Sequence, residues 1–187
     1  MKNLTSALVA WLPFAVAILC IYGAMFLAVQ QYIRLSANEL PLQYAEDTKE
    51  RIEKGLPAAM ALKTTDTVDM DNSLAPFTIV YSRTGTVLAS DAILNRKVPI
   101  PPQGVFDQAL KDGENRRTWQ PAEGVRVAAV VLPWSGRGQK GFVLAGRSLR
   151  EAEMREQFLH DQLSIAAILT LTATYITILL TNFTRKQ

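Results

Sequence analysis

Two long apolar segments enclose a central segment in which charged residues recur throughout. Residues 7–29 contain no charged side chain and are rich in Ala, Val, Leu and Ile. A helix of that length reaches about 35 Å, which is enough to cross a bilayer. A second charge-free run covers residues 162–184, and its apolar body from Leu163 to Leu180 contains several threonines. The pattern predicts two membrane-spanning helices, which we expect at residues 7–33 and 163–183.

Each apolar segment leaves one alternative open. The first could be a cleaved signal peptide, whose apolar region is normally about 7 to 15 residues long and ends at small residues. This run is longer and continues into Gln30, Gln31 and Tyr32, which favours an uncleaved signal anchor. In the second segment, the threonines either bond back to carbonyls one turn earlier, which is the simpler interpretation, or reach a neighbouring helix.

Between the two apolar segments, the pattern changes from helix to strands. Residues 45–54 are typical of a polar helix that ends at Gly55, and Pro41 marks either its beginning or a bend in a helix that continues from the membrane. Residues 77–81 and 86–90 flank a turn that contains Gly85, which predicts a hairpin. A short amphipathic helix closed by Gly113 and three further strands follow, the strands at residues 115–120, 125–132 and 141–146. Five strands with helices at both ends predict one α+β domain of about 100 residues, which is enough for a core of its own.

The last predicted strand leads directly into another helix. Ser148 and Glu151 fit a capping box, and Glu151 and Arg155 have the favourable i,i+4 order. No Gly or Pro occurs from Ser148 to Gln187, so we expect this helix to run unbroken into the second span. It would carry a rearrangement of the last strand to the membrane. Its apolar residues recur near heptad spacing, which fits either a homodimer or packing within one chain.

Composition and charge define the surroundings of the chain. Of its 187 residues, 49% are hydrophobic, and the mean hydropathy of +0.09 is high for a domain in water. The chain has 20 Lys and Arg and 17 Asp and Glu. Residues 34–161 contain 17 of each sign, so the whole excess lies on Lys2, Arg185 and Lys186. A neutral middle argues against nucleic-acid binding despite the pI of 9.1. The positive-inside rule predicts cytoplasmic termini and a central domain outside the bacterial inner membrane.

Motifs for catalysis or cofactors carry little weight in this sequence. One Cys and one His exclude a disulfide framework and a His/Cys zinc cluster. Residues 136–141 fit G-x-G-x-x-G, but they open a strand instead of a helix, so we interpret them as a hairpin loop. The aspartates at 66, 69, 71 and 91 are interpreted as solvated turn residues. We expect no enzyme activity, no cofactor and no metal.

Cations and aromatic residues on the predicted strands provide a candidate ligand site. By strand parity Trp119 and Arg117 share one face, and Arg126 shares a face with Ala128 and Val130. An Arg beside aromatic and small side chains inside a cup is a way to hold a carboxylate or another anion. The alternative is that the arginines lie on a wet face. The candidate ligand-binding residues, for a small anionic ligand, are Tyr81, Arg117, Trp119, Arg126 and Arg147.

Four segments carry a resemblance to a known family: residues 77–85, 118–121, 124–129 and 141–151. Within residues 30–160, the chain resembles the extracytoplasmic PAS-like, single-Cache sensor modules of bacterial histidine kinases and chemoreceptors. The resemblance implies an α+β fold in which two transmembrane helices flank a domain with a long N-terminal helix and a five-stranded antiparallel sheet. Such receptors continue into a HAMP linker and a kinase or methyl-accepting domain, whereas this chain stops at Gln187. The alternatives are a protein that acts through a membrane partner and a piece of a longer receptor.

The expected organisation assigns a role to each part of the chain. The parts are a cytoplasmic N-terminus (1–6), the first span (7–33), a helical linker (34–73), the sheet domain (74–147), an exit helix (148–162), the second span (163–183) and a cytoplasmic tail (184–187). The first hypothesis is a sensory module that passes its state through the membrane to a partner protein or a second copy. The second is an accessory structural subunit of a larger membrane complex. A sensor predicts a closed pocket near Trp119, Arg126 or Arg147, and a subunit predicts a filled core and an exposed apolar patch.

Overall fold

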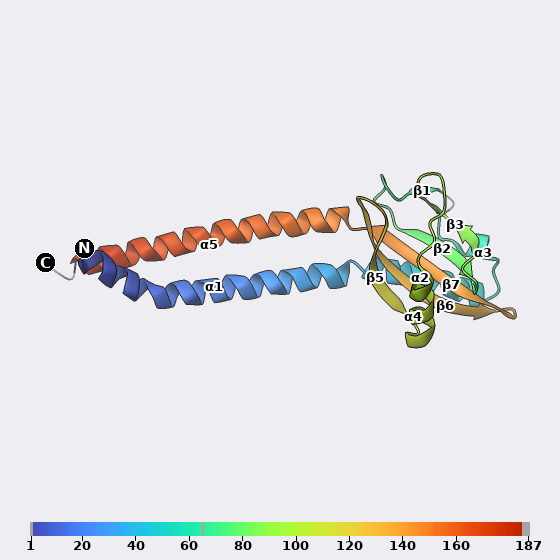
Figure 1. The fold of residues 1–187 in the computed structure, drawn as a ribbon, viewed down its shortest axis with the longest axis horizontal. Coiled ribbons are helices and arrows are strands. Elements are labelled where there is room, and N and C mark those ends of the chain that lie inside the picture. The colour runs from blue at the N-terminus through green and yellow to red at the C-terminus, as the bar shows by residue number, and fades with distance from the viewer. Residues whose placement is uncertain (1, 65, 185–187) are drawn as a thin grey trace. The chain divides into compact units, whose positions relative to one another are not determined.

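The computed structural model describes residues 2–64 and 66–184, and it divides into two compact units. One unit is a sheet domain formed by residues 34–153, and the other is a pair of helical segments, described over residues 2–33 and 154–184. The pair comes from α1 (Lys2–Ser36) and α5 (Arg150–Thr184), and all other elements belong to the domain (Figure 1). Both α1 and α5 are long and apolar enough to cross a membrane, as predicted. Arg185 and Lys186, on which the predicted orientation depends, lie outside the described residues.

A five-stranded antiparallel sheet forms the centre of the domain and confirms the predicted α+β architecture. Its strands follow the order β3-β2-β7-β6-β5, with every neighbouring pair antiparallel. The strands are β2 (Phe77–Ser82), β3 (Val87–Ser90), β5 (Asn115–Ala122), β6 (Val125–Gly136) and β7 (Gln139–Ser148). A small parallel pair of β1 (Val68–Asp69) and β4 (Ala92–Ile93) lies beside this sheet, and the sequence pattern did not predict it.

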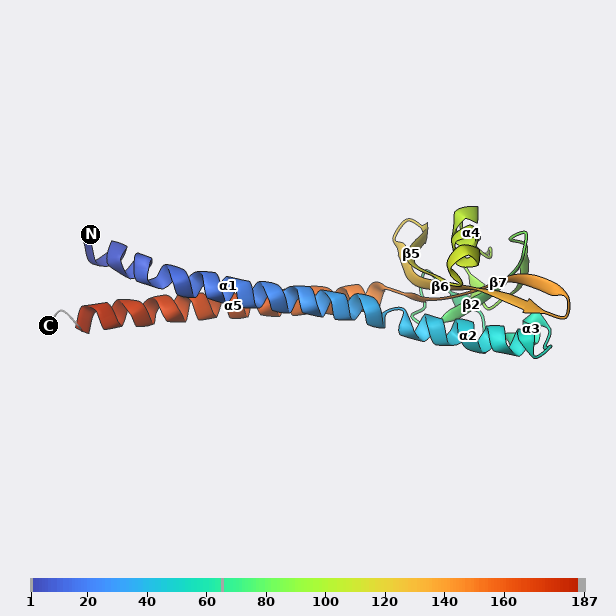
Figure 2. The same ribbon diagram turned by 90° about the horizontal axis from the view of Figure 1, so that it is seen from below.

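Helices cover both faces of the sheet, so the domain has two core layers. On one face α4 (Gln103–Asp112) packs over the side chains of Val127, Ala129 and Val131. The other face, with Val130 and Leu132, packs against α2 (Glu39–Glu53) and α3 (Ala58–Ala61). Successive residues of β6 alternate between the two layers because side chains of a strand point to opposite faces. Figure 2 shows the sheet between α4 and α2.

Glycines with positive φ end the helices and turns where the sequence placed them. Gly55, with φ of +98°, follows α2, and Gly113, with φ of +82°, ends α4 in the left-handed conformation. Gly85 lies in the β2–β3 turn. The G-x-G-x-x-G segment forms the β6–β7 hairpin, in which Arg137 and Gly138 make a two-residue turn with positive φ. The interpretation of this motif as a hairpin loop is therefore confirmed.

Polar contacts join α1 and α5 inside their apolar segments. The Trp11 indole donates to the Leu171 carbonyl at 3.2 Å and to the Thr174 hydroxyl at 3.1 Å. Tyr22 and Thr170 share a hydroxyl hydrogen bond of 3.1 Å. Thr170 and Thr174 also bond back to carbonyls of their own helix, as other threonines of α5 do. Both interpretations of the threonines therefore apply: Thr170 and Thr174 reach α1 and also bond back, whereas Thr172 and Thr177 bond back within α5.

Candidate functional site

The passage from the last strand into α5 is the part of the domain that most directly connects the sheet with a candidate span. β7 ends at Ser148 and α5 begins at Arg150. The Leu149 N–H donates to the Arg126 carbonyl of β6 at 2.9 Å, and the Ser148 hydroxyl accepts from the Arg150 N–H at 3.3 Å. The chain at the start of α5 is thus hydrogen-bonded to two neighbouring strands.

Three arginines reinforce this passage, and we call Arg126, Arg147 and Arg150 the arginine clamp. Arg126 forms an ion pair with Glu153, and Arg147 pairs with Glu151 at 2.7 Å. The Arg147 Nε also donates to the Leu74 carbonyl at 3.3 Å, and Arg150 donates to the Asp71 carbonyl. The clamp therefore holds the first turn of α5 against β6 and against the segment that precedes β2.

Each bond of the clamp is individually weak. The side chains of Arg126 and Glu153 are 51% and 42% exposed. Exposed ion pairs contribute about 0–1 kcal/mol because water screens them and ordering long side chains costs entropy. A set of weak bonds around one helical turn is easily rearranged.

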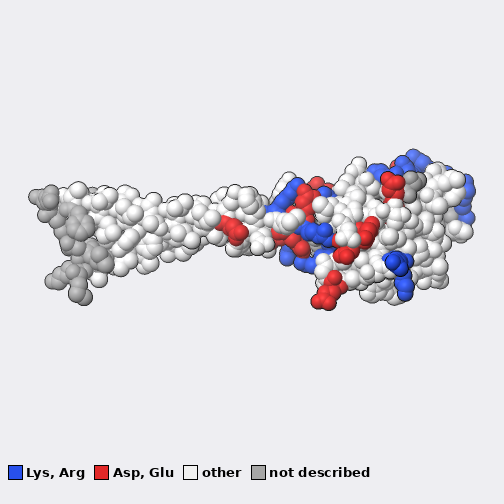
Figure 3. All heavy atoms as spheres, turned by 90° about the horizontal axis from the view of Figure 1, so that it is seen from above, with Lys and Arg blue, Asp and Glu red and all other residues white. Residues whose placement is uncertain are grey.

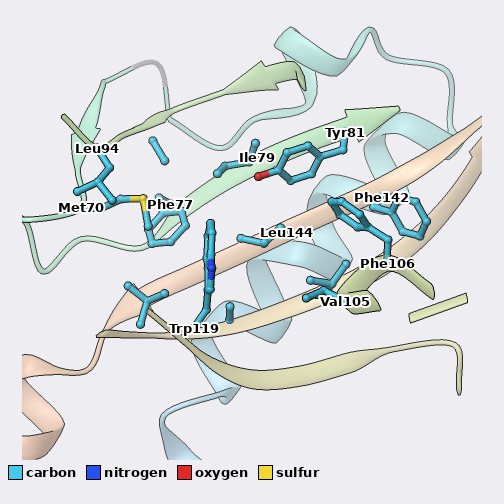
Figure 4. Close-up of a cluster of buried hydrophobic side chains, with 14 of the residues drawn as sticks. Met70, Phe77, Ile79, Tyr81, Leu94, Val105, Phe106, Trp119, Phe142 and Leu144 are labelled. Carbon is cyan, nitrogen blue, oxygen red and sulfur yellow. The ribbon is translucent and has the colours of Figure 1, made fainter. Parts of the chain in front are cut away.

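The predicted ligand residues divide between the two faces of the sheet. Tyr81 and Trp119 belong to the core layer under α4, where they are 0% and 8% exposed (Figure 4). The Tyr81 hydroxyl donates to the Pro99 carbonyl at 2.7 Å, and burial raises the pKa of Tyr81 above its ordinary value. Both aromatic side chains therefore contribute to a filled hydrophobic core.

Two of the three predicted arginines, Arg126 and Arg147, lie on the opposite face of the sheet from these aromatic residues. Arg126 and Arg147 point to the α2 face, since Arg147 is the register partner of Ala128 on β6. Arg117 is exposed on β5, opposite Ala129 and on the α4 side of the sheet. Of the five candidates, the structure thus brings together Arg126 and Arg147 on one face and Tyr81 and Trp119 on the other.

A buried carboxyl group was missed by the sequence analysis. Asp91 is only 4% exposed, so its interpretation as a solvated turn residue is wrong. Its Oδ1 accepts from the Thr78 N–H at 2.6 Å, and burial raises its pKa to about 6. Its burial could have been predicted from its apolar neighbours in residues 88–93, Leu-Ala-Ser-Asp-Ala-Ile. Asp66, Asp69 and Asp71 instead lie in a polar, turn-prone segment.

The side chains of α1 and α5 are apolar on the surface where the two helices pair and also on the surfaces that face away from the pair. Large hydrophobic side chains such as Leu12 and Phe14 on α1, and Ile168 and Leu169 on α5, are more than half exposed. Figure 3 shows charged atoms gathered over the domain, while the helix pair is almost free of them. A helix that is hydrophobic all round requires either a protein core or a lipid environment.

No protein-family model matches the sequence, and no curated protein matches it.

Proposed function

We propose that this protein is a two-span bacterial inner-membrane module whose extracytoplasmic domain senses a condition and passes its state to a partner. The partner is another membrane protein or a second copy, reached through the bilayer by α5. The module has no catalytic activity of its own. The apolar outer faces of both long helices support the membrane anchor, since only lipid or further protein could cover them.

The strand order supports the sensory role. In chain order, the five strands of the sheet lie as second, first, fifth, fourth and third. The resemblance to PAS-like, single-Cache modules implies a five-stranded antiparallel sheet and a long helix before it, and the domain has both, the helix being α2. The strand order makes the central strand β7 the one that continues into α5.

The observation that carries the proposal is the direct passage from β7 to α5. Leu149 alone separates the central strand from a helix of 35 residues, and that helix contains both the clamp partners and an apolar segment. Any shift of β7 must therefore act on α5. An anionic ligand would act at the same place, by replacing Glu151 and Glu153 as the partners of Arg147 and Arg126.

The test is to release the clamp and to observe the helix pair. In a Cys20→Ser background, spin labels at Gln31→Cys and Gln157→Cys report the distance between α1 and α5 in nanodiscs. Because Arg126→Gln removes the ion pair to Glu153, we expect it to shift or broaden this distance distribution. The matched control is Arg116→Gln, which breaks an ion pair of similar exposure, to Glu114, that does not involve α5.

An unchanged distance in Arg126→Gln, or the same change in Arg116→Gln, would contradict transmission through the clamp. That result would favour the second candidate, an accessory structural subunit. The filled core around Tyr81 and Trp119 is the observation on its side, together with exposed apolar residues on the domain such as Met60 and Ile100.

A further inference from the structure

The core layer on the α2 side of the sheet is poorly satisfied in its hydrogen bonds. Among the described residues, the buried polar or charged ones are Thr48, Thr78 and Asp91. Each of the three has one side-chain oxygen without a hydrogen-bond partner. The indole nitrogen of Trp134, in the same layer, also has no partner. Buried polar atoms are normally bonded, so a group of unbonded ones in one layer calls for a physical reason.

The register places Asp91 and Thr78 in this layer together. The Asp91 N–H donates to the Thr78 carbonyl at 3.2 Å, one step beyond the pairing of Ser90 with Ile79. Strand parity then puts Asp91 on the face of Ala89 and Thr78 on the face of Val80, both of which pack in the α2-side layer. The carboxyl group is therefore enclosed between the sheet and the elements that cover this face.

Asp91 also bonds to the β1 segment, whose residues Val68 and Met70 belong to the other core layer. Its carbonyl accepts from the Val68 N–H of β1 at 2.6 Å, and its Oδ1 accepts from the Thr78 N–H of β2. Beside this contact, the Met70 N–H donates to the Ile93 carbonyl of β4 at 2.9 Å. One residue thus joins β1 and β2, so that a change at its carboxyl group acts on the attachment of β1.

The charged groups on the surrounding elements are engaged elsewhere. Lys63, which follows α3, forms an ion pair with Asp47 of α2. Asp69 of β1 accepts from the Asn72 side chain and from the Asp71 N–H, and Asp66 is exposed. Desolvation is the largest cause of the raised pKa of Asp91, and the bond from the Thr78 N–H opposes it.

We propose that the Asp91 carboxyl group is the proton-binding site of this module, and that its ionisation releases β1 from the sheet. This proposal rests on the proposed sensory function and names the proton as the signal. A neutral carboxyl group is tolerated in a dry layer with one hydrogen bond. An ionised one has an oxygen without a donor there, so the ionised state favours an opened segment that admits water.

The expected size follows from the two pKa values. The group titrates near 3.8 in ordinary surroundings and at about 6 here. A difference of about 2 units allows the ratio of open to closed segment to rise by up to about 100-fold as pH rises through 6. The domain is therefore closed in acid and looser at neutral pH.

The test is hydrogen exchange of the full-length protein in nanodiscs at pH 4.5 and 7.5, corrected for intrinsic exchange rates. We expect the protection of residues 66–73 to fall by up to about 100-fold at pH 7.5. Asp91→Asn, which keeps the acceptor for the Thr78 N–H, should remove this dependence. Asp66→Asn, an exposed carboxylate of the same segment, should preserve it. Equal protection of the wild-type segment at both pH values would overturn the proposal.

A second measurement keeps the proposal testable if Asp91→Asn does not fold. Infrared titration of the wild-type protein should show a protonated carboxyl band that disappears near pH 6, and a carboxylate ionised down to pH 4.5 would refute the site.

The spin labels on Gln31→Cys and Gln157→Cys separate the two proposals. If β1 opens with pH while the label distance stays constant, the proton site stands and transmission through α5 fails. If Arg126→Gln changes the label distance but Asp91 does not titrate, transmission through α5 stands and the proton site fails.

Discussion

At Gly141 of β7, neighbouring atoms leave no room for a side chain. A Cβ at this position would lie 2.1 Å from the Tyr81 carbonyl oxygen and 2.9 Å from the Trp134 ring. We expect Gly141→Ala to destabilise the domain by about 3 kcal/mol or more, because backbone on the neighbouring strand has to move. Gly104→Ala is the control: its Cβ meets open space on helix α4, so we expect a gain of about 0.5–1 kcal/mol. Urea unfolding followed by tryptophan fluorescence measures both.

Asp91 also sets how the stability of the domain depends on pH. Its pKa is raised in the folded state, to about 6 from 3.8, so the folded domain binds the proton more tightly than the unfolded chain. The contribution to stability is complete below pH 3.8 and is lost as pH rises through 6. We expect a loss of at most about 3 kcal/mol between pH 4 and 7 and a flatter profile in Asp91→Asn, measured by urea unfolding. A wild-type profile that rises over this range would contradict the assignment.

The elements α1 and α5 offer a matched pair of threonines to test their contact. Thr174 accepts from the Trp11 indole across the pair, whereas Thr172 bonds only to the Ile168 carbonyl of its own helix. We expect Thr174→Val to weaken the association of the helices by about 0.5–1.5 kcal/mol and Thr172→Val to leave it unchanged. The distance between spin labels at Gln31→Cys and Gln157→Cys, in a Cys20→Ser background, measures the difference. Equal effects of both changes would show that the Trp11 contact contributes nothing.

At the element scale, periodic pattern was sufficient for most of the domain. The hairpin around Gly85, the helix closed by Gly113 and the three later strands follow from alternation and from residues that punctuate the chain. β1 and β4 could not be predicted, because each has two residues and alternation over two positions carries no information. α2 begins at Glu39, earlier than its charged stretch indicated, because Pro41 fits the first turn of a helix.

The candidate site was less predictable, because parity within one strand does not say how strands lie relative to one another. Arg117 and Trp119 share a face of β5, as parity required. Whether Arg126 lies on that face depends on the register of β6, and the register places it on the opposite side, near Arg147. The clamp could not be predicted either, because its acidic partners Glu151 and Glu153 come from α5, and strand parity does not say where that helix lies against the sheet.

For the whole molecule, a domain with balanced charges and two helices with long charge-free segments, residues 7–29 of α1 and 162–184 of α5, imply different surroundings. Some charged residues of the domain pair with one another, as those of the clamp do, whereas α1 and α5 expose many large apolar side chains. In water, such a surface would drive aggregation. A lipid bilayer covers it without any partner, and the Thr hydroxyl groups are then satisfied by the carbonyls of α5.

If α5 spans a membrane, two residues that are both exposed in the structure should differ in their reactivity toward a thiol reagent once each is changed to Cys. Ile168 on α5 is 63% exposed, and Lys111 lies exposed at the end of α4. In a Cys20→Ser background, we expect Lys111→Cys to react with a membrane-impermeant maleimide added to intact cells, because the proposed topology places the domain outside. Ile168→Cys should stay unreactive in native membranes and react only after denaturation, since a thiol in lipid neither meets water nor ionises. Labelling of Ile168→Cys in native membranes would refute the second span, and labelling of Lys111→Cys only after lysis would place the domain in the cytoplasm.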